Sequence, residues 1–106
     1  MEINGIQFDM DQIAALCRKY GALKLSLFGS ILREPSPEGG FGFRPTSDID
    51  MLVEFDGNHG DGMRIVRMET ELSDLLRRQV DLRTRAELSP SFAPEVESLA
   101  RSLHAA

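Results

Sequence analysis

Residues 47–55, Ser-Asp-Ile-Asp-Met-Leu-Val-Glu-Phe, alternate polar and apolar side chains and so predict a β-strand with two different faces. Successive side chains of an extended strand point to opposite faces. Asp48 and Asp50 therefore share one face, and the other face carries Ile49, Met51 and Val53. Two adjacent carboxylates repel each other unless a positive group lies between them. Hard cations such as Mg²⁺ take oxygen ligands and bring substrate phosphates with them. The pattern therefore predicts a metal site on the polar face of the strand.

Length and composition favour one globular domain. The chain has 106 residues, of which 42% are hydrophobic, and no apolar run approaches the roughly 18 residues that cross a bilayer. The first residues lack the basic flank and apolar stretch of a secretory signal, and the lone Cys17 cannot form an internal disulfide. We therefore expect a single domain over residues 1–106, no membrane association and cytoplasmic residence.

The charge balance limits the classes of partner. A formal net charge of −5 argues against a surface that grips a nucleic-acid backbone, so we expect no direct nucleic-acid binding. Arginines of the segment 64–78 can pair with acidic residues four positions away on one helix, and that use is favoured over contact with an acidic partner or RNA. Cysteine and histidine are too few and too scattered for a structural zinc site.

Apolar periodicity predicts three helical segments. The first begins at Asp9 or Asp11 and ends at Gly21, a natural helix stop. The second begins near Asp61, and its apolar face recurs at helical spacing: Ile65, Met68, Leu72, Leu75 and Leu76. The third opens at Ser89-Pro90, and the side chains expected to pack on the sheet are Phe92, Val96, Leu99 and Leu103.

Three segments have the period of a strand. Leu23, Leu25 and Leu27 alternate with less apolar residues before Gly29-Ser30 ends the run, and residues 49–55 and 80–84 follow the same pattern. Residues 34–46 contain three prolines and three glycines without periodicity, which predicts a loop between the first two strands.

The residues after the first strand are suited to bind phosphate. Gly29 lets a phosphate oxygen approach the backbone closely, and Ser30 adds a hydroxyl and a backbone N–H where a short helix can begin. Arg33, three residues further on, can reach the same anion. A Gly-Ser pair occurs in many turns, so its meaning depends on the carboxylates that follow.

Asp81 supplies a third carboxylate if its strand joins the same sheet. It alternates with Val80 and Leu82 and would then share the polar face of Asp48 and Asp50. Three such groups suit two metal ions, and Asp81 can also act as a general base. The alternative is a polar edge position in which Asp81 pairs with Arg83 or Arg85.

The order of these blocks resembles a known family. Leu27-Phe28-Gly29-Ser30, residues 47–55 and Val80-Asp81-Leu82 through Leu88-Ser89-Pro90 are similar to the blocks of the minimal nucleotidyltransferases of the DNA polymerase beta-like superfamily. The resemblance implies an α/β (α+β) fold in which helices flank a small mixed β-sheet. It covers most of the chain.

The resemblance also implies a set of roles. Gly29 and Ser30 would bind the triphosphate of ATP. Asp48 and Asp50 would bind both Mg²⁺ ions, and Asp81 would be the third carboxylate. Arg33 and Ser47 complete the expected nucleotide-binding residues. Many single-domain members are antitoxins that bind a HEPN-type toxin and transfer AMP to a tyrosine of that toxin. Such a toxin is the expected partner.

Two departures from the family leave other functions open. Glu34 follows Arg33 where the family often has a glycine, and the segment 34–46 is longer than usual. One alternative is a non-enzymatic antitoxin or binding module that neutralises its partner by covering it. Another is a subunit of a two-component nucleotidyltransferase that acts on a small molecule. Phe41 or Phe43 can stack on adenine or on the partner, or be incidental to the loop.

Overall fold

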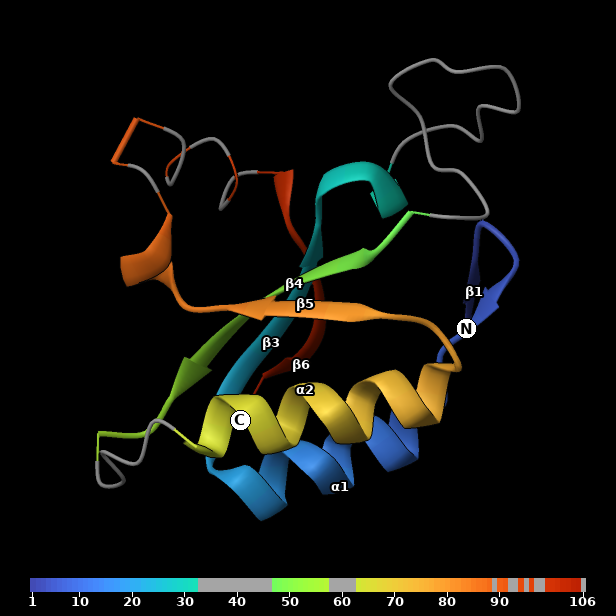
Figure 1. Ribbon diagram of the computed structural model, residues 1–106, viewed down its shortest axis with the longest axis horizontal. Coiled ribbons are helices and arrows are strands. Elements are labelled where there is room, and N and C mark those ends of the chain that lie inside the picture. Colours follow the sequence, from blue (N-terminus) through green and yellow to red (C-terminus); the bar gives the residue numbers. More distant parts are fainter. Residues whose placement is uncertain are drawn as a thin grey trace.

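The computed structural model describes residues 1–32, 47–57, 63–88, 90, 91, 94, 96 and 99–105. Its principal sheet has four strands in the order β5-β4-β3-β6: β3 spans Ala22–Phe28, β4 Ile49–Phe55, β5 Val80–Arg83 and β6 Arg101–Ala105. β4 pairs in parallel with β5 and antiparallel with β3, and β3 pairs antiparallel with β6. The expected mixed sheet is therefore confirmed (Figure 1).

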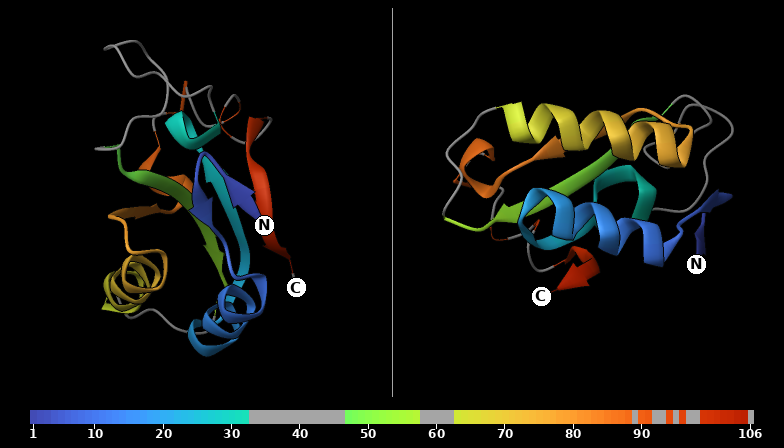
Figure 2. Two further views of the ribbon diagram at one scale, coloured as in Figure 1. Left: turned by 90° about the vertical axis from the view of Figure 1, so that its right-hand side faces the viewer. Right: turned by 90° about the horizontal axis from the view of Figure 1, so that it is seen from below.

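Helices α1 (Met10–Tyr20) and α2 (Met63–Leu76) lie on the same side of this sheet (Figure 2). α1 begins where the Asp9 side chain accepts a hydrogen bond from the backbone N–H of Gln12, and it ends at Gly21 with φ +70°. Asp9 thus satisfies one of the free N–H groups of the first turn, and glycine takes the left-handed conformation that ends the helix. Both ends agree with the prediction.

The core lies between the two helices and the apolar face of the sheet. Its fully buried members include Ile13 and Cys17 from α1, Met68 and Leu72 from α2, and the inward side chains of the strands: Leu25, Leu27, Ile49, Met51 and Val80. Burying one such side chain contributes roughly 1.5–3 kcal/mol, so the apolar alternation of each strand fixes which face turns inward.

Leu23 does not share the buried face of Leu25 and Leu27. It is 43% exposed, whereas Ala22 is buried. The pairing of β3 with β4 shifts register between Ala22 and Lys24, and a bulge of this kind changes the face on which the following side chains lie. The alternation of the three leucines predicts the strand but does not reveal the bulge.

The predicted last helix does not reach Leu103. Residues 94, 96 and 99 are helical, but Leu99 is 68% exposed. Leu103 is buried, yet it lies on β6. β3 would otherwise present an unpaired edge, and the tertiary pairing with that edge overrides the helical periodicity. Phe92 lies outside the described residues.

A small hairpin precedes α1 and was not predicted. β1 (Glu2–Ile3) and β2 (Ile6–Gln7) pair antiparallel, and both turn residues, Asn4 and Gly5, have positive φ. An Asn-Gly pair between two short strands is a strong hairpin signal, because both residues tolerate the left-handed conformation.

Two short 3-10 helices, η1 (Gly29–Leu32) and η2 (Arg85–Glu87), complete the described elements. Within the described residues, neither α-helix has both the length and the hydropathy that a membrane span requires.

Candidate active site

The carboxylates predicted to bind metal lie at one end of the sheet, on the face that α1 and α2 leave uncovered. Asp50 pairs in register with Phe28 on one side and with Asp81 on the other. Adjacent strands lie about 4.8 Å apart, so the parallel register sets the two aspartates side by side. β4 thus brings the phosphate-binding turn after β3 and the carboxylate of β5 to one place.

Gly29 packs directly on the side chain of Asp50. Its φ is +76°, and a Cβ atom built on Gly29 would lie 2.5 Å from Oδ2 of Asp50. Any larger residue would meet both a backbone penalty and a collision with the carboxylate. Gly29 was predicted to let a phosphate oxygen approach the backbone, and the structure shows that it also makes room for Asp50.

The surroundings of Asp50 favour its neutral form. Partial burial raises the pKa of its carboxyl most, the charge of Asp81 raises it further, and Asp48 adds to the rise. Arg83 acts in the opposite direction. A cation placed beside Asp50 would relieve both the desolvation and the repulsion, so the oxygen-rich donor set fits a hard ion such as Mg²⁺.

Asp81 is paired with Arg83, the alternative that the sequence left open. Nη2 of Arg83 donates to Oδ2 of Asp81 at 2.9 Å, and Nε donates to the same oxygen at 3.2 Å. The residues are two apart on β5, so they share the open face of the sheet. A guanidinium therefore supplies the positive charge beside this carboxylate.

The remaining predicted site residues differ in how far the structure describes them. Asp48 is exposed and immediately precedes β4, and Ser30 is half-buried in η1. Ser47 accepts a hydrogen bond at its carbonyl oxygen from Nε of Arg78 at 3.1 Å. Arg33, Phe41 and Phe43 lie outside the described residues.

As the side chains lie, the three aspartates do not form a closed metal cluster. Within the described parts of the chain, no group of three carboxylate, histidine or cysteine side chains is close enough to hold an ion. The backbone brings Asp50 and Asp81 together, but Arg83 holds the Asp81 side chain and Asp48 extends into solvent. The metal role of these residues therefore stays a prediction.

Two residues of α2 position β5 and were not predicted. Glu69 accepts the backbone N–H of Leu82 at its Oε2 atom (2.8 Å), and the Ser73 hydroxyl accepts that of Val80 (3.0 Å). These bonds flank Asp81 and satisfy N–H groups on the outer edge of the sheet. In the sequence these contacts are indicated only by the four-residue spacing of Glu69 and Ser73. Many solvent-exposed helix faces carry the same pattern, so it does not distinguish these two residues.

Asn4 supports the phosphate-binding turn from the N-terminal hairpin. Its Nδ2 atom donates to the carbonyl oxygen of Ile31 at 2.8 Å, across 27 positions of sequence. This bond ties η1 to the hairpin, and the burial of Ile31 anchors the turn in the core. Asn4 is therefore a supporting residue for Gly29 and Ser30.

The open face continues from Asp50 along β4 as two hollows that share Leu52 and Glu54. The smaller has a volume of about 220 Å³ and is lined by Lys24, Ser26, Leu52, Glu54 and Ala100. The larger has about 510 Å³ and is lined by Leu52, Val53, Glu54, Phe55, Thr84, Arg85 and Ala86. Neither hollow is lined by Asp48, Asp50 or Asp81, so both lie further along the open face than the carboxylates.

A family comparison decides the identity of this fold. The model of the nucleotidyltransferase domain matches residues 10–103, which include every site residue named above except Asn4. The chain belongs to the nucleotidyltransferase family. The resemblance predicted from the glycine-serine turn and the three aspartates is thereby confirmed, and the chain is an enzyme of the nucleotidyltransferase class.

The chain is also similar in sequence to a curated protein. The chain is 36% identical over 90 residues to a protein of Methanocaldococcus jannaschii named "Putative protein adenylyltransferase", with 85% of each chain covered.

Solved structures have the same nucleotidyltransferase fold. A minimal nucleotidyltransferase structure matches with a TM-score of 0.68 at 26% identity, over 88% of this chain and 85% of that one. A chain of a toxin–antitoxin structure with AMP-PNP matches with a TM-score of 0.66 at 23% identity, over 93% and 75%. A chain in a complex of a tri-AMPylated Shewanella oneidensis HEPN toxin with its MNT antitoxin gives 0.61 at 20% identity, over 92% and 70%.

Proposed function

We propose that this nucleotidyltransferase transfers AMP from ATP to a hydroxyl group of a protein, a tyrosine of a HEPN-type toxin, and so acts as an antitoxin. The observation that carries the proposal is the register that gathers Gly29, Asp50 and Asp81 at one end of an open sheet face. The adenylyltransferase name of the 36% identical relative supports AMP as the transferred group. The toxin–antitoxin complexes that share the fold support the partner.

Each site residue has a role in this proposal. Backbone and hydroxyl groups of Gly29 and Ser30 bind the triphosphate, with Arg33 and Ser47 completing the nucleotide contacts. Asp48, Asp50 and Asp81 would hold Mg²⁺, two ions in our proposal, which neutralises phosphate charge when bound. Positioning and charge neutralisation supply most of the rate enhancement in phosphoryl transfer.

The transfer exchanges one phosphorus–oxygen bond for another. The acceptor oxygen forms a bond to the α-phosphorus of ATP, and the bond from that phosphorus to the bridging oxygen breaks. Pyrophosphate leaves, and the Asp81 carboxylate accepts the proton of the acceptor hydroxyl. Arg83 donates to the Oδ2 atom of Asp81, so the proton would go to the Oδ1 atom. Cytoplasmic residence would supply both ATP and Mg²⁺.

Mass spectrometry of the partner tests this function. The HEPN-type toxin that the proposal requires as partner is incubated with the purified chain, ATP and Mg²⁺, and the intact mass of the toxin should increase by one or more AMP groups. Asp50→Asn should abolish the gain. Glu54→Gln is the matched control, because Glu54 is exposed on the same face of β4, four positions after Asp50. A full mass gain with Asp50→Asn would refute the assignment.

The second candidate is that this nucleotidyltransferase neutralises the toxin by covering it rather than by transferring AMP to it, and the ion pair between Arg83 and Asp81 favours this candidate. With Asp81 neutralised by a guanidinium, the chain could cover its partner without assembling a metal site. A stable complex of wild-type chain and toxin, without any gain of mass in ATP and Mg²⁺, would support covering over AMP transfer.

A further inference from the structure

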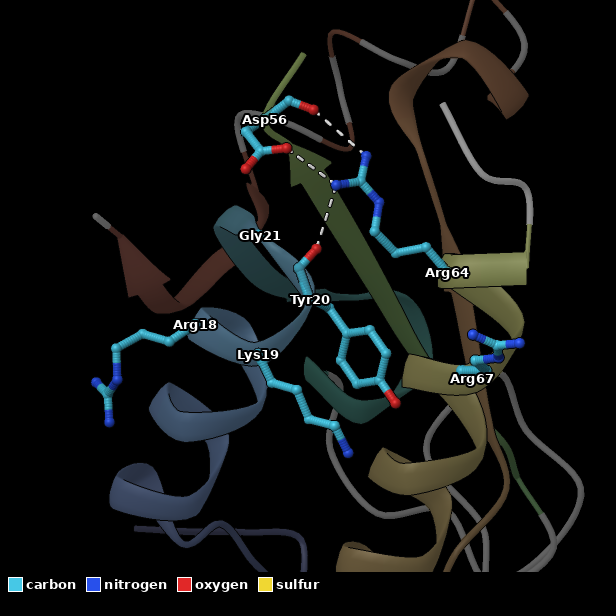
Figure 3. Close-up of a pocket in the computed structure, with 7 residues that line it drawn as sticks. All are labelled: Arg18, Lys19, Tyr20, Gly21, Asp56, Arg64 and Arg67. Atoms are coloured by element: carbon cyan, nitrogen blue, oxygen red, sulfur yellow. Dashed lines mark hydrogen bonds and ion pairs between the residues drawn. The ribbon is translucent and has the colours of Figure 1, made fainter. Parts of the chain in front are cut away.

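A second pocket lies at the far end of the sheet from the aspartates, near the pairing of Ala22 with Phe55. Its volume is about 720 Å³, and its lining is drawn in Figure 3: Arg18, Lys19, Tyr20, Gly21, Asp56, Arg64 and Arg67. Four of these seven residues are cationic and one is anionic, on a protein whose formal net charge is −5. The pocket is thus a local basic site on an acidic molecule.

Arg64 forms the rigid back wall of this basic pocket. Its Nη1 atom donates to Oδ1 of Asp56 at 3.0 Å and to the carbonyl oxygen of Tyr20 at 3.2 Å. Its guanidinium also lies 4.1 Å from the ring centroid of Phe55, and its side chain is only 12% exposed. Arg64 therefore joins the end of α1, the end of β4 and the start of α2, and its charge is largely satisfied within the protein.

The other lining residues between Lys19 and Asp56 are also held by contacts within the protein. A Cβ atom on Gly21 would lie 2.6 Å from Oδ2 of Asp56, and the Asp56 N–H donates to the Gly21 carbonyl at 2.8 Å. Lys19 and the Tyr20 hydroxyl both contact Glu71 of α2. These contacts hold the pocket open without a ligand.

Arg18 and Arg67 are different from the other cations of the pocket. Both are exposed, and neither has a hydrogen bond or ion pair among the residues that the structure describes. Figure 3 shows them on opposite sides of Tyr20, Arg18 from α1 and Arg67 from α2, with their guanidinium groups directed away from each other. One small anion cannot bridge two such guanidinium groups. A peptide chain with several carboxylates can place one carboxylate on Arg18 and another on Arg67.

We propose that this basic pocket docks an acidic segment of the protein substrate, with Arg18 and Arg67 each binding a carboxylate of that segment. The proposal rests on the proposed function, because it adds a second contact for the same protein acceptor. Complementary charge across an interface speeds association and fixes orientation. The pocket would therefore set which protein is presented to the aspartates, and in which orientation.

The position of the pocket suits a protein better than a nucleic acid. β3 has seven residues, and at about 3.3 Å per residue its two ends lie roughly 20 Å apart. A protein interface of ordinary size, about 800 Å² on each partner, covers such a span. A nucleic acid would instead run along a continuous basic surface, which a chain of net charge −5 does not favour.

The first test needs no catalysis. ¹⁵N-labelled protein is titrated with a hexaglutamate peptide at low salt, and amide shifts should be saturable and confined to the pocket lining. Arg18→Glu/Arg67→Glu should weaken this binding by about tenfold or more. Arg77→Glu/Arg101→Glu is the matched control, because it makes the same change in net charge at two exposed arginines outside the pocket lining and should bind as wild type.

Three results would overturn the proposal. They are the absence of saturable shifts, equal weakening in both double variants, or tighter binding of single-stranded dA12 with the same dependence on Arg18 and Arg67. The last result would assign the pocket to nucleic acid. Circular dichroism of both variants verifies that the fold is intact.

The second test uses the HEPN-type toxin. Arg18→Glu/Arg67→Glu should raise the KM for the toxin by about tenfold and leave kcat unchanged, since the aspartates lie at the other end of the sheet. Affinity for the toxin without ATP should fall by the same factor. If the wild-type chain transfers no AMP, the proposed function fails, while the peptide titration still decides the pocket. A change in kcat alone would refute docking.

Discussion

Arg83 binds a single oxygen of Asp81 through two of its nitrogens, at 2.9 and 3.2 Å. The two residues lie on the same strand and the same face, so the contact needs no other part of the chain. The acidic end of the sheet therefore carries its own cation. A metal ion that binds Asp81 must compete with this guanidinium.

Removal of Arg83 should strengthen divalent-metal binding. The Arg83 side chain is 47% exposed and the Asp81 side chain 33% exposed. An ion pair as exposed as this contributes only about 0.2–1 kcal/mol to stability. Arg83→Ala should therefore tighten Mn²⁺ binding, measured by electron paramagnetic resonance, by up to about fivefold. Arg85→Ala removes the same charge two residues further on and is the control. Unchanged affinity in Arg83→Ala would show that the ion pair does not compete with metal.

Gly29→Ala should inactivate the enzyme by displacing Asp50. The new Cβ would lie 2.5 Å from Oδ2 of Asp50, and a displacement of about 1 Å in a catalytic group can reduce a rate about a hundredfold. Gly5→Ala is a matched control, because Gly5 has a similar φ of +80° but no atom within 4 Å of the new Cβ. Both variants should lose about 1 kcal/mol of stability to backbone strain. Equal AMP transfer by the two would contradict the collision.

Asp50→Asn should stabilise the metal-free protein while it abolishes transfer. The folded state raises the pKa of Asp50 through burial and then through the charge of Asp81. A raised pKa means that the carboxyl favours folding most at low pH, and that this contribution is lost as pH rises through the folded-state pKa. At pH 7 in EDTA, Asn should therefore raise the Tm above that of wild type.

Asp48→Asn provides the comparison for this measurement. Asp48 is exposed and lies outside the strand, so its replacement should leave the Tm in EDTA close to that of wild type. A Tm of Asp50→Asn below that of Asp48→Asn would show that the Asp50 carboxylate stabilises the fold.

Cys17 should resist alkylation in the folded protein. Burial raises the pKa of its thiol to about 11, against a smaller opposing effect of Arg18, so the reactive thiolate is scarce at pH 8.5. Iodoacetamide should add one group only after denaturation, as read by intact mass, because the chain has a single cysteine.

The same shift makes stability depend on pH. The unfolded thiol ionises near its ordinary pKa of 9.0 while the folded thiol stays protonated, so the free energy of unfolding should fall as pH rises from about 9 toward 11. Rapid labelling of the folded chain at pH 8.5 would contradict the burial of Cys17.

Patterns that repeat within a few residues allowed most of the fold to be predicted. Asp9 and Gly21 bound the first helix because capping is a local property, and alternation located β4 because one of its faces is buried. The bulge that exposes Leu23 and the edge pairing that makes β6 a strand depend on a partner distant in sequence. Local patterns carry no information about such partners.

The site was predicted in the same uneven way. The order of Gly29, Asp50 and Asp81 along the chain indicated the family. The contacts that hold these residues in place could not be predicted from that order. Asn4 reaches Ile31 across 27 positions, and Arg64 was expected to pair along its own helix but binds Asp56 instead. Side-chain pairing across a fold follows from packing, which spacing alone does not specify.

The two ladders of β4 have a consequence for how this domain can change in evolution. Gly29, Asp50 and Asp81 meet only because the register of β4 with β3 and with β5 is correct, and a slip of one residue would turn Asp50 into the apolar core. Insertions and deletions within the three strands are therefore selected against.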